Sequence, residues 1–444
     1  MLQAFVNSFK IPDLRKKILL TLALVSIYRL GAYIPTPGID GNKLAQFFEE
    51  LAKTQGGTLF GIMNMFSGGA VERLTIFALG IMPYISSSII LQLLTAVIPS
   101  LEKMAKEGEI GRRKITQYTR YGTVVLALIQ SFFISLWIED PARFGGLQIV
   151  QFPGWRFRAL TVLTLTSGTA FIMWLGEQIT EYGIGNGMSL LITVGIISRI
   201  PTALVQLYFL VTKQELTGIR LISMMVMMVA VIVAVILITQ AARKIPVQYA
   251  KRIVGRKVYG GQNTYIPLRI NQAGVIPIIF AQSIILFPAS MAGLVPHPGL
   301  QSFAHLLLRG HLVYTLLYGA LIIFFSFFYT AITLNPIDLA DNMKKYGGFV
   351  PGVRPGKPTA EHFDYIITRI TWPGAIFLTL IAIFPDFVGA SFQVPYLVAS
   401  FFGGTGLLII VGVMLDTMKQ IESHLLMRHY EGFMKSGHLK ARRT

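Results

Sequence analysis

The residues that most often carry out chemistry in proteins form no active-site pattern in this sequence. All seven histidines lie in loops, at the end of an apolar stretch or in the C-terminal tail, away from the middle of any such stretch. This placement argues against an intramembrane serine protease or zinc protease. The sequence contains no cysteine, which excludes thiolate metal sites and cysteine nucleophiles. We therefore expect no catalytic residue, no metal site and no cofactor.

The acidic residues and the one glycine-rich loop also fail to match known catalytic motifs. Asp386 lies at an outer turn and Asp416 near the inner end of the last apolar stretch, so no two carboxylates share the middle of the membrane as in an aspartyl protease. The segment from Gly352 to Lys357 is similar to a phosphate-binding loop. However, Pro358 stands where the Ser or Thr after the lysine belongs. The chain is not expected to be an enzyme.

Few ionisable side chains lie deep in the apolar stretches. Arg29 is the clearest, and Glu177 and Arg199 lie nearer the ends. A transporter that couples solute movement to ions usually needs a buried acid or base, so this scarcity favours a passive conduit. Neutral polar residues do recur at depth, and two interpretations stay open: hydrogen bonds between packed helices, or a seam that opens. These residues include Gln92, Gln130, Asn271 and Gln282.

Ten long apolar stretches must position all of these residues. Each runs about 17 to 25 residues, enough for one helical crossing of a bilayer. Of the 39 Lys and Arg residues, 28 fall in the two ends and in alternate loops, ten in the other loops and one within a stretch. By the positive-inside rule, the basic side is the cytoplasm and holds both termini. The stretches begin near Ile18, Leu74, Tyr121, Ala159, Ile184, Ile219, Gln272, Leu312, Ile366 and Pro395.

The composition agrees with an all-α protein that crosses the membrane many times. Hydrophobic residues make up 53% of the chain and charged residues 14%, which is too apolar for a soluble multidomain enzyme. The net charge of +18 could suggest a nucleic-acid binder, but most of the excess lies where the membrane topology places it.

Ten crossings divide evenly into two halves of five, and an odd number per half gives the halves opposite orientations. Inverted halves place a functional site at their interface, near the middle of the bilayer. We expect an N-terminal part at 1–240, whose crossing six, from near 219, already belongs to the second half. This part is followed by a basic cytoplasmic loop at 241–271 and by the remaining crossings at 272–421, which include a second basic loop at 335–365. The chain ends in a cytoplasmic tail at 422–444.

One apolar segment, Thr58 to Ser67, is too short to cross. It is bracketed by Gly56-Gly57 and Gly68-Gly69, and ten helical residues span roughly 15 Å, about half a bilayer. Two interpretations are equally open from the pattern: a re-entrant helix inside the bundle, or an amphipathic helix in the membrane interface. Glycines at both ends favour an element that moves.

Seven blocks of the sequence, collinear over nearly the whole chain, resemble the SecY family, the channel subunits of the bacterial protein translocon. The blocks are IYRLGAYIPTPGID (27–40), FALGIMPYISSSIILQLL (77–94), GRRKITQYTRYGT (111–123), WLGEQITEYGIGNG (174–187), INQAGVIPIIFAQSIILFP (270–288), FFYTAITLNPIDLADNMKKYGGFVPGVRPG (327–356) and GGTGLLIIVGVMLD (403–416).

The resemblance implies two inverted pseudo-symmetric halves around an hourglass pore. It also implies that the short segment is a re-entrant plug helix, which fills the outer funnel until a substrate displaces it. The plug residues would be Thr58, Leu59, Phe60, Ile62, Met63, Asn64, Met65 and Phe66.

At the waist of the pore, the resemblance implies a ring of apolar side chains. Spacing alone would not identify them, because isoleucine pairs in membrane helices usually face lipid or the core. A narrow apolar constriction dewets and blocks hydrated ions, and methionine at one position keeps it apolar and flexible. The ring residues are Ile85, Ile89, Met188, Ile192, Ile279 and Ile409.

The resemblance further implies a lateral gate, a docking surface and partners. Gln92 and Thr95 would face Asn271 and Gln282 at a gate that opens toward lipid. Basic residues of two cytoplasmic loops would dock the ribosome and the SecA ATPase through phosphates and acidic surfaces. SecE, SecG, signal-bearing preproteins and nascent membrane proteins are the other implied partners. The docking residues are Lys251, Arg252, Arg256, Lys257 and Arg354.

Two functions are therefore compared. The first is a protein-conducting channel of the cytoplasmic membrane that also releases apolar segments into lipid. The alternative is an inverted-repeat secondary transporter of a small solute, which should carry a coupling acid in the middle of the membrane. The short glycine-bracketed segment, the scarcity of buried acids and the family resemblance favour the channel.

Overall fold

The computed structural model describes residues 11–54, 64–144, 146–214, 216–249, 252–254, 257–259, 263–294, 299, 306–307, 312–392 and 394–436. The chain forms two compact units. The first comprises Met1–Tyr208, Leu286–Leu308 and Ile409–Thr444, and the second comprises Phe209–Ile285 and Arg309–Leu408. The boundaries predicted for the two sequence halves, the loops and the tail stay a prediction.

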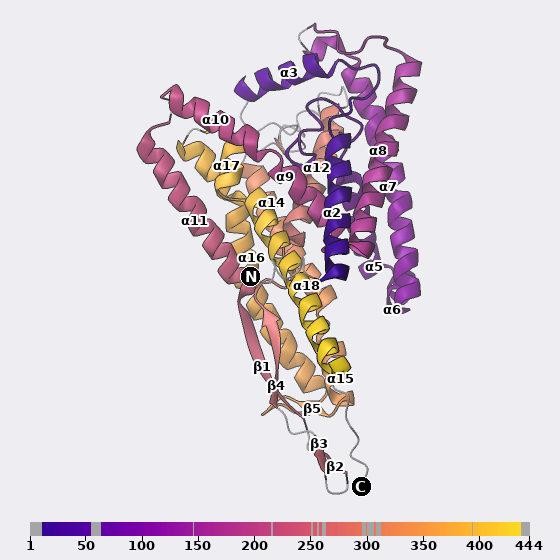
Figure 1. Ribbon diagram of the computed structural model, residues 1–444, viewed down its shortest axis with the longest axis vertical. Helices are drawn as coiled ribbons and strands as arrows, with labels where there is room; N and C mark the ends of the chain where they lie inside the picture. Colours follow the sequence, from indigo (N-terminus) through magenta and orange to yellow (C-terminus); the bar gives the residue numbers. More distant parts are fainter. Residues whose placement is uncertain are drawn as a thin grey trace. The chain divides into compact units, whose positions relative to one another are not determined.

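Most long helices of the chain overlap the predicted apolar stretches, although α5 begins at Met82 and not near Leu74 (Figure 1). Their bounds are α2 (Pro12–Gly31), α3 (Gly41–Thr54), α5 (Met82–Val97), α6 (Pro99–Lys106), α7 (Glu109–Ile138), α8 (Trp155–Tyr182), α9 (Gly187–Ile197), α10 (Ile200–Thr212), α11 (Gly218–Gln240), α12 (Ile276–Leu294), α14 (Leu312–Thr333), α15 (Pro336–Lys345), α16 (Lys357–Phe392), α17 (Tyr396–Phe402) and α18 (Thr405–Ser436).

Among the described residues, seven helical segments are long and apolar enough to cross a membrane, or eight if the bent pair α5 and α6 is one span. The bend between α5 and α6 is 101° and lies at Pro99, which lacks the backbone donor that a continuous helix needs. The predicted multi-pass helical fold is confirmed, and the count of ten crossings stays a prediction.

In the first unit, α7 packs against both α8 and α5, and α2 packs against α8 and α9 (Figure 1). Small residues allow the close approach of α5 and α7: Gly122 leaves room for Ser87, whose hydroxyl donates to the Thr119 carbonyl at 2.9 Å. At the end of α7, Trp137 packs edge-on against Phe144, with ring centroids 4.8 Å apart. These contacts form a closely packed helical core.

In the second unit, α16 packs against α14 and α15, and a small sheet extends from α11 (Figure 1). Strand β1 (Ala242–Tyr249) pairs antiparallel with β4 (Asn263–Arg269), with Ala242 opposite Arg269, and with β5 (Gly348–Phe349). Two further strands, β2 (Arg252–Val254) and β3 (Lys257–Tyr259), form a separate hairpin. The segment predicted only as a basic loop is therefore largely folded.

The sheet is held by an apolar cluster of the second unit. Ile245 and Val247 point to the same face of β1 and pack with Leu268, Met343 and Phe363. Alternate residues of a strand share a face, so Ile245 and Val247 bury together while Lys244 is exposed. Apolar burial thus fixes which face of β1 and β4 packs against α15 and α16.

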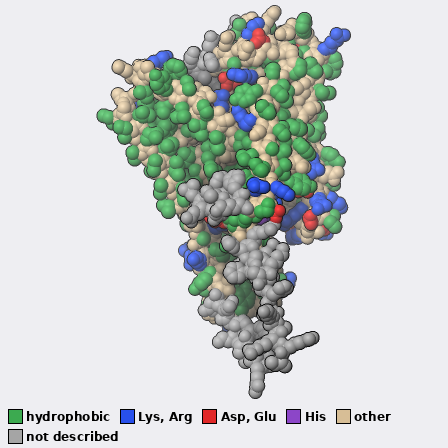
Figure 2. Space-filling model, in the orientation of Figure 1, with side chains coloured by type: hydrophobic (Ala, Val, Ile, Leu, Met, Phe, Trp, Pro, Cys, Tyr) green, Lys and Arg blue, Asp and Glu red, His purple; other side chains and the backbone are tan. Residues whose placement is uncertain are grey.

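Large apolar side chains cover much of the outer surface of the helices (Figure 2). On α11, Ile219 is 83% exposed and Ile222 is 66% exposed. Such extensive exposed apolar surface is costly in water but favourable against lipid tails. The exposed surface therefore agrees with the membrane location predicted from composition.

Candidate functional site

The described end of the short apolar segment is a buried turn in the first unit. Met65 and Phe66 are almost fully buried, at 1% and 3% exposure. Gly68 and Gly69 follow with φ angles of +67° and +93°, a region that glycine adopts without strain. The Gly69 amide donates to the Asn64 carbonyl at 2.8 Å, which closes the turn. Asn64, Met65 and Phe66 of the predicted plug are thus described, whereas Thr58, Leu59, Phe60, Ile62 and Met63 lie outside the described residues.

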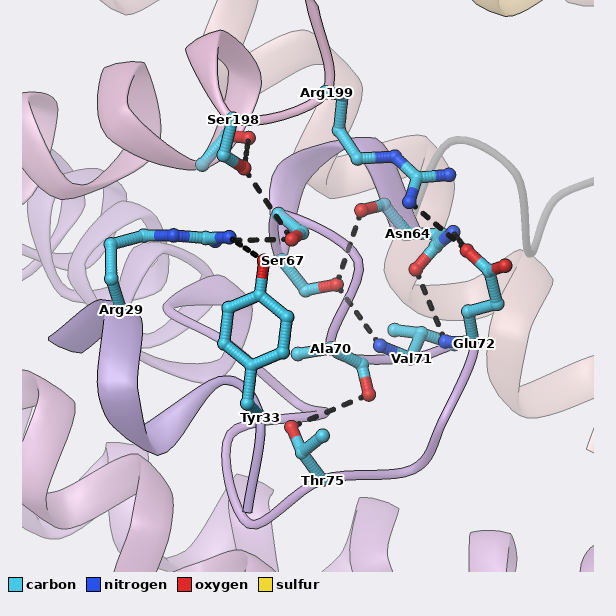
Figure 3. A network of polar contacts seen from close by, with 12 residues as sticks. Arg29, Tyr33, Asn64, Ser67, Ala70, Val71, Glu72, Thr75, Ser198 and Arg199 are labelled. Carbon is cyan, nitrogen blue, oxygen red and sulfur yellow. Dashed lines mark hydrogen bonds and ion pairs between the residues drawn. The ribbon is translucent and has the colours of Figure 1, made fainter. Parts of the chain in front are cut away.

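An ionic network fastens this turn to the junction of α9 and α10 (Figure 3). The side-chain amide of Asn64 donates to Glu72 Oε2 at 2.9 Å, and its Oδ1 accepts the Glu72 backbone N–H at 3.1 Å. Arg199 Nη1 binds the same Oε2 at 3.0 Å. The two charged side chains are 17% and 21% exposed. Asn64 is therefore joined through Glu72 to Arg199.

A second set of contacts holds the backbone of the same turn (Figure 3). The Gly68 carbonyl accepts Arg29 Nη1 from α2 at 3.1 Å and lies 3.4 Å from the Ser198 hydroxyl, which also donates to it. Arg29 donates to the Tyr33 hydroxyl as well, at 3.2 Å. Because these contacts end on a backbone oxygen, they do not depend on any side chain of the turn.

Close packing supplements the polar contacts. A Cβ atom at Gly195 of α9 would lie 2.8 Å from the Phe66 carbonyl oxygen and 3.4 Å from the Gly68 nitrogen. The turn therefore lies directly against the backbone of α9, and only glycine at 195 leaves space for it.

Four of the predicted ring residues are deeply buried in the first unit, and they belong to three helices. Ile85 and Ile89 share one face of α5, Ile192 lies on α9 and Ile409 on α18, with exposures of 5% or less. Met188 also belongs to this unit but is only half-buried, and its sulfur occupies the space that Gly176 leaves on α8. In the second unit, Ile279 of α12 is 5% exposed.

The predicted gate residues differ in their surroundings. Gln92 and Thr95 are half-buried on α5, where Gln92 Nε2 donates to the Ser88 hydroxyl at 3.1 Å. In the second unit Asn271 is 7% and Gln282 2% exposed. Neither side-chain polar atom of Gln282 has a hydrogen-bond partner among the described residues, and such a group is costly to bury.

Three of the five predicted docking residues lie on described loops of the second unit. Arg252 belongs to β2 and Lys257 to β3, whereas Lys251 and Arg256 lie outside the described residues. Arg354 is exposed in the turn before α16. Its carbonyl accepts the Thr359 hydroxyl at 2.7 Å, so the backbone that presents this side chain is held in place.

Sequence reasoning missed Glu72 and Ser198 as members of the network around the turn. It noted Arg29 and Arg199 only as ionisable residues in an apolar setting. A signal was present, because an arginine near an apolar crossing requires a compensating acceptor. Glu72, three residues after the glycine pair, is an acid close to the turn in sequence that could provide it.

Comparisons with known proteins identify similar chains. A family model described as SecY matches residues 75–418. A protein translocase subunit SecY from Streptomyces galbus is 49% identical over 449 residues, covering 98% of this chain and 100% of that protein. The protein of the same description from Mycobacterium tuberculosis strain H37Rv is 46% identical over 449 residues, with the same coverage.

Solved structures show the same fold. A structure of a protein conducting channel matches with a TM-score of 0.65 at 18% identity, covering 96% of this chain and 94% of that chain. A structure concerned with the plug domain of SecY matches with a TM-score of 0.62, 18% identity and the same coverage. Sec61 in a canine ribosome-channel complex matches with a TM-score of 0.60 at 17% identity, covering 96% and 94%.

Proposed function

The chain belongs to the SecY family of protein translocase subunits, and from this premise we propose how its residues close, open and dock a protein-conducting channel. The protein is a multi-pass protein of the cytoplasmic membrane and serves as a translocation channel subunit, not as an enzyme. The observation that carries the proposal is the buried turn at residues 64–72, which ends the short apolar segment against α9.

The short segment from Thr58 to Ser67 acts as the plug, and the residues of the apolar ring form the constriction. Support for the plug comes from Met65 and Phe66, which are buried although the segment is too short to cross the membrane. Support for the ring comes from the burial of Ile89 and Ile192 and from the apolar nature of every member. Such side chains close around a passing chain without recognising its sequence, and they exclude hydrated ions.

The gate residues keep the channel closed toward lipid in the resting state. Gln282 supports this role, because its buried side-chain amide has no hydrogen-bond partner among the described residues and would be stabilised by gaining one. A polar seam between helices opens at lower cost than a fully packed apolar one when an apolar segment enters. A segment of about 20 apolar residues then gains free energy by moving into lipid, while a polar segment crosses to the other side.

The basic turns and hairpin of the second unit dock cytoplasmic partners. Arg354 is exposed on a backbone held by Thr359, which suits recognition of an acidic protein surface. We assign this surface to SecA and to the ribosome, whose complex with the similar Sec61 channel has been solved. SecE and SecG complete the complex, and signal-bearing preproteins and nascent membrane proteins are its substrates.

Site-specific photocrosslinking tests the proposal. A photoreactive amino acid replaces Ile279, SecE is supplied, and ribosomes stalled on a signal-bearing chain are added to native-like membranes. We expect a crosslink from residue 279 to the nascent chain and none from the same probe at Ile222, which is 66% exposed on α11. Absence of the crosslink at 279, with the ribosome bound, would contradict the ring assignment and direct attention to solute transport.

A further inference from the structure

The ion pair between Glu72 and Arg199 joins two parts of the chain 127 residues apart, beside an apolar segment. Both side chains are largely withdrawn from water, and Arg199 Nε is buried without a hydrogen-bond partner among the described residues. Placing charges there is costly unless they are paired, and removing one partner leaves the other uncompensated. An apolar pair of similar volume would pack the same site without that cost, so stability alone does not account for the ion pair.

The contacts of the turn divide into two sets that end on different atoms. Arg29 and Ser198 bind the backbone carbonyl of Gly68, while Arg199 reaches Asn64 only through the Glu72 carboxylate. The first set can persist whatever the side chain of Asn64 does. The second set is broken as soon as Asn64 turns away from Glu72. The turn thus has a permanent backbone contact at Gly68 and a releasable side-chain contact at Asn64.

We infer that Asn64, Glu72 and Arg199 form a polar latch that holds the end of the plug segment in its resting position. Glu72 and Arg199 are positioning residues: they orient the acceptor that holds Asn64 and so set the fraction of channels whose plug is displaced. This inference rests on the channel function proposed above. It assigns control of the fraction of closed channels to a side-chain network that is separate from the apolar ring.

The latch is suited to reversible release. The Asn64 side chain donates one hydrogen bond to the Glu72 carboxylate and accepts one from the Glu72 backbone N–H. Glu72 is 21% exposed, so water can replace the Asn64 amide when the segment leaves. The positive charge of Arg199 continues to hold Glu72 after release, so the acceptor remains in place. The turn can then close again without a search for its partner.

Ion conductance of the resting channel tests the latch. Arg199→Gln removes the charge that orients Glu72, and Glu72→Gln removes the ionised acceptor. We expect each to raise the resting conductance of the complex with SecE in planar bilayers about tenfold, the change in a population that 1.4 kcal/mol produces. Arg199→Lys keeps the charge and should stay near wild type.

A matched control comes from a second ion pair of the same unit. Arg158 of α8 binds Glu139 Oε2, directly after α7, at 2.6 Å, and neither residue takes part in the contacts that hold the turn. Arg158→Gln should leave the resting conductance unchanged, although it too breaks a partly buried pair. Conductance with a translocating chain bound should be equal in all variants, because the segment is then displaced in each of them. A merely structural effect would change both conductances.

The outcomes separate the latch from the channel function itself. Should Arg199→Gln fail to assemble with SecE, Asn64→Ala removes the same link from its other end and should produce the same leak. If Arg199→Gln and Asn64→Ala both conduct as wild type, while deletion of residues 57–67 opens the channel, the latch is refuted and the channel function stands. If no variant conducts, that deletion included, and residue 279 gives no crosslink, the channel function fails first.

Discussion

Replacing Gly195 with alanine tests how tightly the turn at 64–72 must seat on α9. The added methyl group would lie 2.8 Å from the Phe66 carbonyl oxygen, closer than a Cβ atom approaches backbone oxygen in real structures. Since the neighbour is backbone, it cannot rotate away as a flexible side chain would. The turn must therefore move away from the helix.

Two effects of this change oppose each other, but they act on different equilibria. Alanine in a helix interior is favoured over glycine by about 1 kcal/mol. That gain is present whether the turn is seated or displaced, because α9 is helical in both states. Overpacking costs about 1–3 kcal/mol and exists only when the turn is seated. The lower value already raises the displaced fraction about fivefold.

The assay measures ion efflux from proteoliposomes that contain the complex with SecE, together with the thermal unfolding midpoint. We expect Gly195→Ala to leak at least about fivefold faster than wild type with little loss of thermal stability. Gly218→Ala is the matched control, because no atom of the described residues lies within 4 Å of a Cβ built at that position of α11. Equal efflux from Gly195→Ala and wild type, with both folded, would refute the idea that close seating of the turn closes the channel.

Further predictions concern the plug, the docking surface, the sheet and α6. Deleting residues 57–67 should raise ion leakage through the resting protein, and equal conductance in planar bilayers would contradict the sealing role. Arg354→Glu should leave insertion and folding intact but slow SecA-driven transport, and unchanged transport kinetics would exclude the docking role. Phe363→Ala removes a fully buried ring from the sheet cluster, at a local cost of about 3–5 kcal/mol. The β1 amides should therefore exchange hydrogen faster, and unchanged exchange would argue that the cluster does not hold the sheet. The hydrogen bond from Lys106 lowers the pKa of Glu102, so the contact is present at neutral pH and is lost as pH falls through that pKa. Lys106→Gln should raise the pKa of Glu102 measured by NMR. An unaltered pKa would show that Lys106 does not cause the lowering.

The membrane helices are the part of the fold that local sequence specifies best. The apolar stretches from near Ala159 and Ile219 correspond to α8 and α11, because a bilayer requires a continuous apolar helix at each crossing. The basic loop at 241–271 was predicted only by its charge. The alternation of Ile245 and Val247 in this loop indicates a strand. The residues that this strand face packs against, Met343 and Phe363, lie about 100 residues later in the sequence.

The pore ring and the gate depended on family resemblance, because an isoleucine that lines a pore has the same local pattern as one that faces lipid. The structure adds burial for Ile89 and Ile192, and for Gln282 a buried amide without a partner in the described part of the chain; their functional roles stay predictions. Met188 illustrates the limit, since its contact with Gly176 of α8 follows from the close packing of two helices. No spacing rule within α9 contains that information.

The sequence by itself determined the class of protein, its orientation in the membrane and the presence of a short apolar segment between glycines. These properties depend on composition and on local runs of apolar or basic residues, because each segment partitions into the bilayer according to its own sequence. Only the tertiary structure decided that Arg29, Ser198 and Arg199 converge on residues 68–72. Arg29 and Ser198 lie 39 and 130 residues from Gly68 in the sequence, and they meet its carbonyl because helices pack in three dimensions. Contacts over such separations leave no periodic trace in the sequence.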